Sequence, residues 1–106
     1  MALTEERTRP VAKDTPPLNR KEAHELARQV PGWSLADGRL EEDFRFKDFD
    51  ETMQFVDRVA RVAQEEDHHP DIEISYNKVH LTLSTHTIGG LSRNDFIVAA
   101  KIDRLL

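Results

Sequence analysis

The chain has 106 residues, of which 33% are charged and 38% are hydrophobic, and its formal net charge is −5. This size suits one domain, and the scattered positive charges argue against nucleic acid or a membrane surface as the main partner. The absence of cysteine excludes disulfides, cysteine nucleophiles and thiolate metal ligands. No apolar run approaches the roughly 20 residues that span a bilayer, and no secretory signal is evident, so we expect a cytoplasmic protein.

The first 17 residues are polar and include prolines at positions 10, 16 and 17. Such a composition favours an extended, flexible segment over a packed element. We therefore interpret residues 1–17 as a flexible N-terminal arm without a function of its own, and residues 18–106 as one folded domain.

Two helices are predicted in the first two thirds of the chain, where apolar residues recur at intervals of three and four. The first spans about residues 20–29, with Asn19 as its N-cap in a capping-box pattern. The second has Asp50 as a plausible N-cap and runs to about residue 66. Its wide apolar face is typical of a helix that lies across a sheet.

Between these helices we predict two strands. The first starts at residues 33–35, and the tight-turn signal Asp37-Gly38 leads into a second strand over residues 39–46. Glu42 interrupts the apolar face of the second strand, so we expect that end of the strand to be exposed.

The last third of the chain begins with a predicted β-hairpin over residues 72–83, with Asn77-Lys78 as its turn. Ser92 and Asp95 then form the S-x-x-D pattern that starts a third helix. The order α-β-β-α-β-β-α predicts an α+β fold, a four-stranded, mainly antiparallel sheet with helices packed on one face.

Four of the five histidines flank or lie within this hairpin. Because the two ends of a hairpin lie side by side, these imidazoles can form a histidine-lined site at one end of the sheet. His68 and His69 precede the hairpin. A regular second strand that continues past the hairpin would have an apolar face and a polar face, the latter formed by His80, Thr82, Ser84 and His86.

The residues alone leave three interpretations of the histidines open. A metal site needs three or four ligands, and neither an H-x-x-x-H helix motif nor a cysteine supports one here. The histidines can instead be structural residues of a surface or an interface. General acid–base catalysis without a metal fits best, because the charge of histidine changes near neutral pH.

The chain also resembles the pterin-4a-carbinolamine dehydratases from about residue 18 to its C-terminus. A combined pattern of this length is highly specific, whereas an isolated His-His-Pro would not be. The matching residues are Gly32-Trp33, Phe46-Lys47-Asp48-Phe49, His68-His69-Pro70, Tyr76-Asn77-Lys78-Val79-His80, Leu83-Ser84-Thr85-His86, Gly90-Leu91-Ser92 and Asp95.

The resemblance implies that the protein converts 4a-hydroxytetrahydropterin to quinonoid dihydropterin and water. This reaction recycles the pterin that aromatic amino-acid hydroxylases leave hydroxylated, and it needs no metal or organic cofactor. The resemblance also implies a homodimer or homotetramer. The chemistry agrees with the histidines, because loss of hydroxide needs a general acid and formation of the C4a–N5 double bond needs a base.

The resemblance also implies roles for individual residues. His68 and His86 correspond to the acid–base pair, His69 to a histidine that orients the substrate and aids the reaction, and Asp95 to a carboxylate that acts on a histidine. The role of His80 is less clear, and it can be structural. The residues expected to contact the pterin are Asp67, His68, His69, Ser84, Thr85, His86 and Thr87.

One departure and one alternative accompany this resemblance. Family members often carry an acidic residue four positions before the first histidine of the pair, where this chain has Gln64. The alternative function is a binding, assembly or regulatory protein on the same fold, because some relatives act without the catalytic histidines. Fold alone does not separate these functions.

Overall fold

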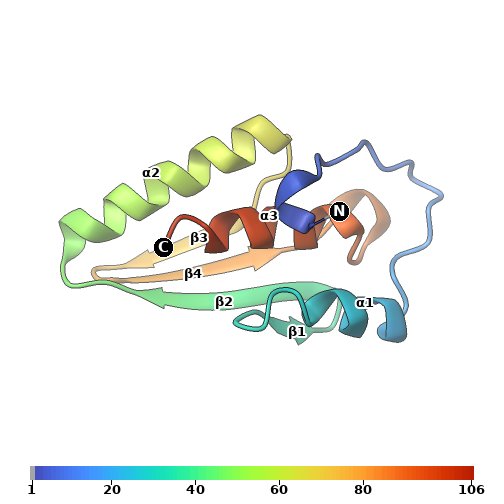
Figure 1. Cartoon of the computed structure of the whole chain (residues 1–106), viewed down its shortest axis with the longest axis horizontal. Coiled ribbons are helices and arrows are strands. Elements are labelled where there is room, and N and C mark those ends of the chain that lie inside the picture. Colours follow the sequence, from blue (N-terminus) through green and yellow to red (C-terminus); the bar gives the residue numbers. More distant parts are fainter. Residues whose placement is uncertain (1) are drawn as a thin grey trace.

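The computed structural model describes residues 2–106 and has helices on one face of an antiparallel sheet (Figure 1). The strand order is β1-β2-β4-β3, which confirms the predicted α+β fold. No helix in this part of the chain is long and apolar enough to cross a bilayer. The elements are η1 (Leu3–Glu5), α1 (Arg20–Ala27), β1 (Ser34–Ala36), β2 (Arg39–Arg45), α2 (Phe49–Glu66), β3 (Asp71–Ser75), β4 (Lys78–Leu83), η2 (His86–Ile88) and α3 (Arg93–Asp103).

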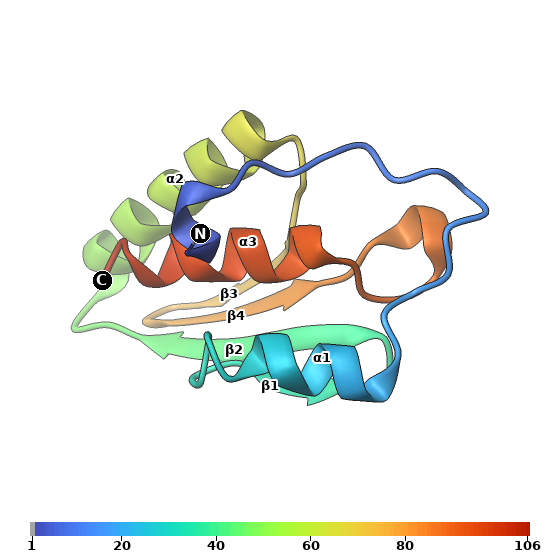
Figure 2. The ribbon, with the colours of Figure 1, turned by 45° about the vertical axis from the view of Figure 1, so that its right-hand side comes forward.

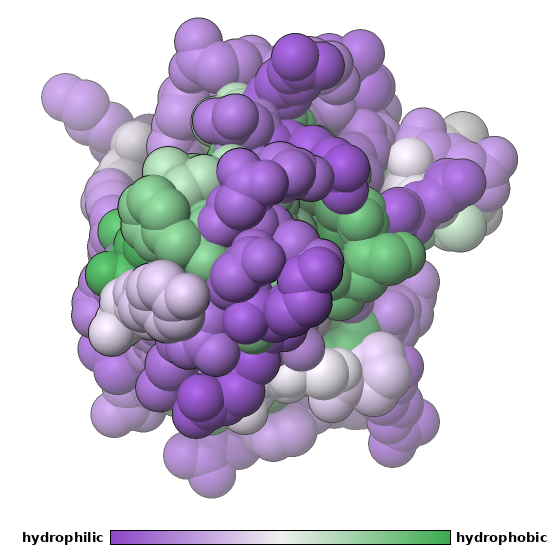
Figure 3. Space-filling model, turned by 90° about the vertical axis from the view of Figure 1, so that its left-hand side faces the viewer, coloured by the Kyte–Doolittle hydropathy of each residue, from purple (hydrophilic) through white to green (hydrophobic). Residues whose placement is uncertain are grey.

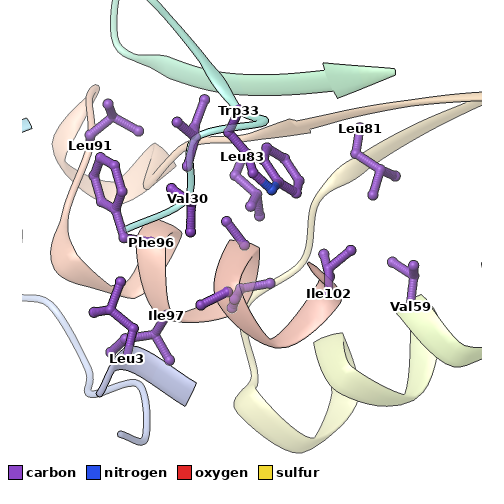
Figure 4. Close-up of a cluster of buried hydrophobic side chains, with 14 of the residues drawn as sticks. Leu3, Val30, Trp33, Val59, Leu81, Leu83, Leu91, Phe96, Ile97 and Ile102 are labelled. Carbon is purple, nitrogen blue, oxygen red and sulfur yellow. The ribbon is translucent and has the colours of Figure 1, made fainter. Parts of the chain in front are cut away.

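The core lies between the sheet and the helices. Val79, Leu81 and Leu83 alternate along β4 and are fully buried, as the apolar period of this strand predicts. Side chains of α3 pack against this strand, with Phe96 and Ile102 fully buried (Figure 4). The central strand β4 and helix α3 therefore anchor the domain, and β4 ends and α3 begins near the candidate site.

Local signals explain where the helices begin, with one correction. The Asn19–Glu22 capping box forms as predicted, with hydrogen bonds of 2.9 and 2.8 Å. Helix α2 starts earlier than expected, because Asp48 rather than Asp50 is its N-cap. The Asp48 carboxylate accepts the backbone N–H of Glu51 at 2.9 Å, which satisfies a free donor of the first turn.

The hairpin turn is also displaced from the predicted position. Ser75 pairs with Lys78, so the turn residues are Tyr76 and Asn77 rather than Asn77 and Lys78. Tyr76 has a φ of 50°, a left-handed conformation that a tight hairpin turn requires. Asn77 holds the turn to β2 by donating a side-chain hydrogen bond of 3.1 Å to the Phe46 carbonyl.

Glu42 of β2 is half-buried, which differs from the exposed strand end that we expected. Its side chain lies against Gly32, where an added Cβ would come within 2.6 Å of Oε1. Oε2 of Glu42 is buried without a hydrogen-bond partner. Burial, with Asp103 nearby, raises the pKa of Glu42 to about 7, so this carboxyl accepts a proton more readily than an exposed one.

The N-terminal segment packs against the domain, whereas we expected a flexible arm outside it. Leu3 is only 2% exposed and joins the core beside Ile97 (Figure 4). Further along, the carboxylate of Glu6 accepts two hydrogen bonds of 2.7 Å from Arg93. Composition did not predict this packing, because Leu3 is the one large apolar side chain among residues 2–17 that enters the core.

This packing predicts that Leu3 contributes to stability. Replacing it with alanine should lower the free energy of unfolding by about 2–4 kcal/mol, because the substitution leaves a cavity in the core. Urea unfolding followed by circular dichroism measures the change. Leu106→Ala is the matched control, since Leu106 is 71% exposed. Equal stability of the two variants would show that the segment does not pack in solution.

Candidate active site

The end of α2 reverses the chain and places the first site histidine. Asp67 adopts the left-handed conformation, with φ of 51°, and the backbone N–H of His68 donates to the Ala63 carbonyl at 3.1 Å. This is a helix C-cap for which Asp is one of the more tolerant residues after glycine and Asn. The reversal turns His68 toward the start of α3.

His68 meets a buried carboxylate at that point. Its Nε2 lies 2.6 Å from Oδ1 of Asp95, whose side chain is fully buried. The other oxygen, Oδ2, accepts the Thr85 hydroxyl at 2.8 Å and the Ser92 backbone N–H at 2.9 Å. The Ser92 and Thr85 hydroxyls lie 2.6 Å apart. Asp95 therefore caps α3, as predicted, and also holds His68.

This hydrogen bond determines which ring nitrogen is available for chemistry. A carboxylate only accepts hydrogen bonds, so the hydrogen between the two groups belongs to Nε2 of His68. Nδ1 then remains free to accept a proton in the neutral ring or to donate one in the imidazolium. A carboxylate behind a histidine also stabilises the imidazolium form.

His68 opens into a cavity of about 360 Å³. Three larger hollows, of about 620, 580 and 390 Å³, contain none of the four residues predicted to be catalytic, so we place the site by its chemistry rather than by size. The residues lining the cavity at His68 are Thr8, Arg9, Pro10, Val11, Glu66, Asp67, His68, Thr85, Thr87 and Asn94.

Four predicted site residues thus line one cavity, namely Asp67, His68, Thr85 and Thr87. Asp95 reaches it through its bond to His68. No pattern in the sequence pointed to the N-terminal part of the wall, and we interpreted that segment as an arm outside the domain. The lining residues missed by sequence reasoning are Thr8, Arg9, Pro10, Val11, Glu66 and Asn94.

The other predicted residues lie outside the lining of this cavity. His69 is exposed, and its Nε2 lies 2.7 Å from the amide oxygen of Gln64, the position where an acid was expected. The Ser84 hydroxyl donates to the Gly38 carbonyl at 2.9 Å. His86 is exposed on η2 and does not share a strand face with His80, because β4 ends at Leu83.

Comparison with known proteins agrees with this geometry. The family model described as pterin 4 alpha carbinolamine dehydratase matches residues 16–105, which contain His68, Asp95 and the two threonines of the cavity. The chain belongs to the pterin-4a-carbinolamine dehydratase family. The resemblance seen in the sequence is thereby confirmed, whereas the roles of individual residues remain predictions.

The relatives cover almost the whole chain. A protein from Nitrosomonas eutropha is 48% identical over 105 residues, which are 98% of this chain and 93% of that protein. One from Rubrobacter xylanophilus is 44% identical and covers 97% of both chains. Both are named provisionally as pterin-4-alpha-carbinolamine dehydratases. These alignments extend into the N-terminal segment, which the family model leaves out.

Two solved structures share the fold. One is a transcriptional coactivator/pterin dehydratase from Brucella melitensis, with a TM-score of 0.80 and 32% identity over 84% of this chain and 97% of that chain. The other is a pterin dehydratase-like protein identified as a RuBisCO assembly factor in the alpha-carboxysome. Its TM-score is 0.58 at 27% identity, covering 69% of this chain and 84% of that one.

In this dehydratase-family domain the remaining hairpin histidine, His80, joins two strands. Its Nδ1 lies 2.7 Å from the Asp43 carboxylate and its Nε2 lies 3.0 Å from Glu41. These hydrogen bonds, first from Asp43 and then from Glu41, raise the pKa of His80 above its usual value. Among residues 2–106, no three His, Asp or Glu side chains form a group that could hold a metal ion.

His80 should therefore stabilise the fold more at low pH than at high pH. Its pKa is raised in the folded protein, so its contribution is complete below the unfolded pKa of about 6.5 and is lost as the pH rises through the folded value. The His80→Gln substitution should cost more at pH 6 than at pH 9, by up to about 1 kcal/mol as for exposed ion pairs. Urea unfolding at both pH values measures this difference.

His24→Gln is the matched control for this prediction. His24 is exposed and bonds only the Arg20 carbonyl, at 2.8 Å, so it has no carboxylate partner. Its substitution should show no such difference between pH 6 and pH 9. A pH-independent effect of His80→Gln would contradict an ionic role of His80.

Proposed function

We propose that this protein is a pterin-4a-carbinolamine dehydratase, which converts 4a-hydroxytetrahydropterin to quinonoid dihydropterin and water in the recycling of tetrahydropterin. The observation that carries the proposal is the hydrogen bond of 2.6 Å between His68 and the buried Asp95, at a cavity in a chain of this family. The absence of cysteine from the sequence fits a reducing, cytoplasmic setting.

The chemistry needs two proton transfers. The C4a–O bond breaks as the hydroxyl receives a proton and leaves as water, and a ring nitrogen loses a proton as the C4a–N5 double bond forms. The free Nδ1 of His68 is suited to one transfer, with Asp95 stabilising the imidazolium. We assign the second transfer to His86, since its neighbours Thr85 and Thr87 both line the cavity. Neither transfer requires a metal or an organic cofactor, and His69 is assigned to orienting the substrate.

Stopped-flow dehydration of synthetic 4a-hydroxytetrahydropterin tests this function. The wild-type protein should accelerate the reaction over buffer. His68→Ala should lower kcat by about 10²–10⁴-fold, the usual contribution of general acid–base catalysis. Asp95→Asn should lower it by about 10–100-fold, because it removes the charge that holds and stabilises the ring.

His24→Ala is the control for these variants, since His24 lies on α1 and outside the cavity. It should keep the wild-type rate. A wild-type protein that does not accelerate the reaction would contradict the dehydratase function. An unchanged rate in His68→Ala would contradict only the role of His68. His86→Ala measured in the same series decides whether His86 is the second acid–base group.

A second candidate function is an assembly or binding role without catalysis. It is supported by the likeness to the pterin dehydratase-like protein that is a RuBisCO assembly factor. The paired His68 and Asp95 favour catalysis, because a purely structural role does not need a buried carboxylate behind a cavity histidine. Absence of acceleration by a folded wild-type protein would favour the binding role.

We also propose that the protein associates with copies of itself. Strand β3 is an edge of the sheet, and such edges are ready to pair with another chain. Ile72 and Ile74 on this strand are 37% and 42% exposed. At the adjacent turn, the exposed rings of Phe49 and Tyr76 are stacked, with centroids 6.3 Å apart. Figure 3 shows hydrophobic patches, in green, among hydrophilic residues at this end of the molecule.

Light scattering at micromolar concentration should therefore give the mass of a dimer or tetramer. Ile74→Glu should shift the mass toward the monomer, because it places a charge among apolar groups of the edge strand. Glu73→Gln, on the opposite face of the same strand, is the matched control and should leave the mass unchanged. A wild-type monomer at this concentration would contradict self-association.

A further inference from the structure

The strap, which we define as residues 6–11, crosses the domain next to the candidate site. In Figures 1 and 2 the N-terminal segment passes over the start of α3 and the turn after β4 before it descends to α1. Four of the ten residues lining the cavity belong to it, from Thr8 to Val11. The strap therefore forms one wall of the cavity into which His68 opens.

Two buried side chains hold the backbone of the strap. The Asn94 amide pairs with both main-chain groups of Arg9, accepting its N–H at 3.0 Å and donating to its carbonyl at 2.7 Å. Oε1 of Glu66 accepts the backbone N–H of Thr8 at 2.9 Å, and the Thr8 hydroxyl donates to the Glu66 carbonyl. Two adjacent residues of the strap are thus fixed from opposite helices.

The Glu66 carboxylate is itself held by cations. Its Oε2 lies 2.7 Å from Lys101 Nζ and 3.1 Å from Arg7 Nε. Burial of Glu66 opposes ionisation, but the bonds from Lys101 and Thr8 outweigh it and lower the pKa of Glu66 below its usual value. The Glu66 carboxylate is therefore charged at neutral pH, which strengthens its hydrogen bond to the backbone of the strap.

Glu66 and Asn94 are each close in the sequence to one member of the hydrogen-bonded pair His68 and Asp95. Glu66 comes two positions before His68, and Asn94 immediately precedes Asp95. The helix end that carries His68 and the helix start that carries Asp95 therefore also position the strap. A wall connected in this way keeps a fixed distance from His68 and Asp95.

We infer that the strap is the outer wall of the pterin site, and that Asn94 is the positioning residue that holds it against bound substrate. This inference rests on the proposed dehydratase function. Pro10 and Val11 offer the bound ring apolar contacts, and the wall limits the access of water to the pair. Contacts of this kind act on substrate and transition state alike, so they affect KM more than kcat.

Steady-state kinetics of Asn94 variants test the inference. Asn94→Ala should raise KM about tenfold, equivalent to about 1.4 kcal/mol of binding, with kcat within about twofold of wild type. Asn94→Asp keeps the acceptor for the Arg9 N–H but loses the donor to the Arg9 carbonyl. The KM of this variant should therefore lie between those of the wild type and Asn94→Ala. Arg93→Ala is the matched control and should keep the wild-type KM. It removes the hydrogen bonds to Glu6 at the start of the strap, and neither Arg93 nor Glu6 lines the cavity.

Limited trypsin digestion provides a readout that does not depend on catalysis. The Arg7–Thr8 bond lies within the strap, whereas the bond after Arg9 resists trypsin because Pro10 follows. Addition of 7,8-dihydropterin should slow cleavage at Arg7 severalfold in the wild-type protein, since cleavage follows local opening. Cleavage after the exposed Arg28 should be unaffected, and Asn94→Ala should lose the protection.

The outcomes separate this inference from the proposed function. If the wild-type protein is active and Asn94→Ala has the same KM as Arg93→Ala, the inference about the strap is overturned, whereas the dehydratase function still holds. Protection by dihydropterin without any acceleration would support the strap and contradict the dehydratase. If Asn94→Ala does not fold, digestion of the wild-type protein decides, and cleavage at Arg7 that ignores the ligand overturns the inference.

Discussion

The buried carboxylate of Asp95 is the constraint around which the site is built. An ionised group that is fully buried is tolerated only if it is paired and hydrogen-bonded. Asp95 receives its donors from three parts of the fold: His68 after α2, Thr85 after β4, and the Ser92 N–H at the start of α3. These segments must stay together for the buried carboxylate oxygens to keep their hydrogen bonds, so a requirement of stability also fixes the position of His68 beside Asp95.

Three carboxylates of this small domain show different responses to burial. Asp95 is paired with donors, and Glu66 is held by Lys101 and by the strap. Glu42, by contrast, has a buried oxygen without a partner, and its pKa rises to about 7. Where donors are arranged around the group, as at Asp95 and Glu66, the carboxylate connects neighbouring segments through its hydrogen bonds. Where they are missing, the carboxyl accepts a proton more readily instead.

The hydrogen-bond partners of each histidine likewise determine what that histidine can do. His68 has one nitrogen bound and one free, which suits proton transfer, whereas both nitrogens of His80 face carboxylates, which suits a structural ion pair. His69 bonds the amide oxygen of Gln64, at the position where the resemblance led us to expect an acid. A histidine-rich segment therefore contains different kinds of histidine, and only their partners across the fold distinguish them.

The sequence by itself determined the helices, the strands and the α+β class, because capping hydrogen bonds and apolar periodicity act between residues that are close in the chain. The family followed from the resemblance of its motifs. The sequence also identified the Ser92–Asp95 cap and the buried face of β4. Only the tertiary structure decided that Asp95 holds His68, and that the N-terminal segment reaches Glu66 and Asn94, which are 58 and 85 positions away. Such contacts leave no local pattern, since the partners meet only after the helices pack on the sheet.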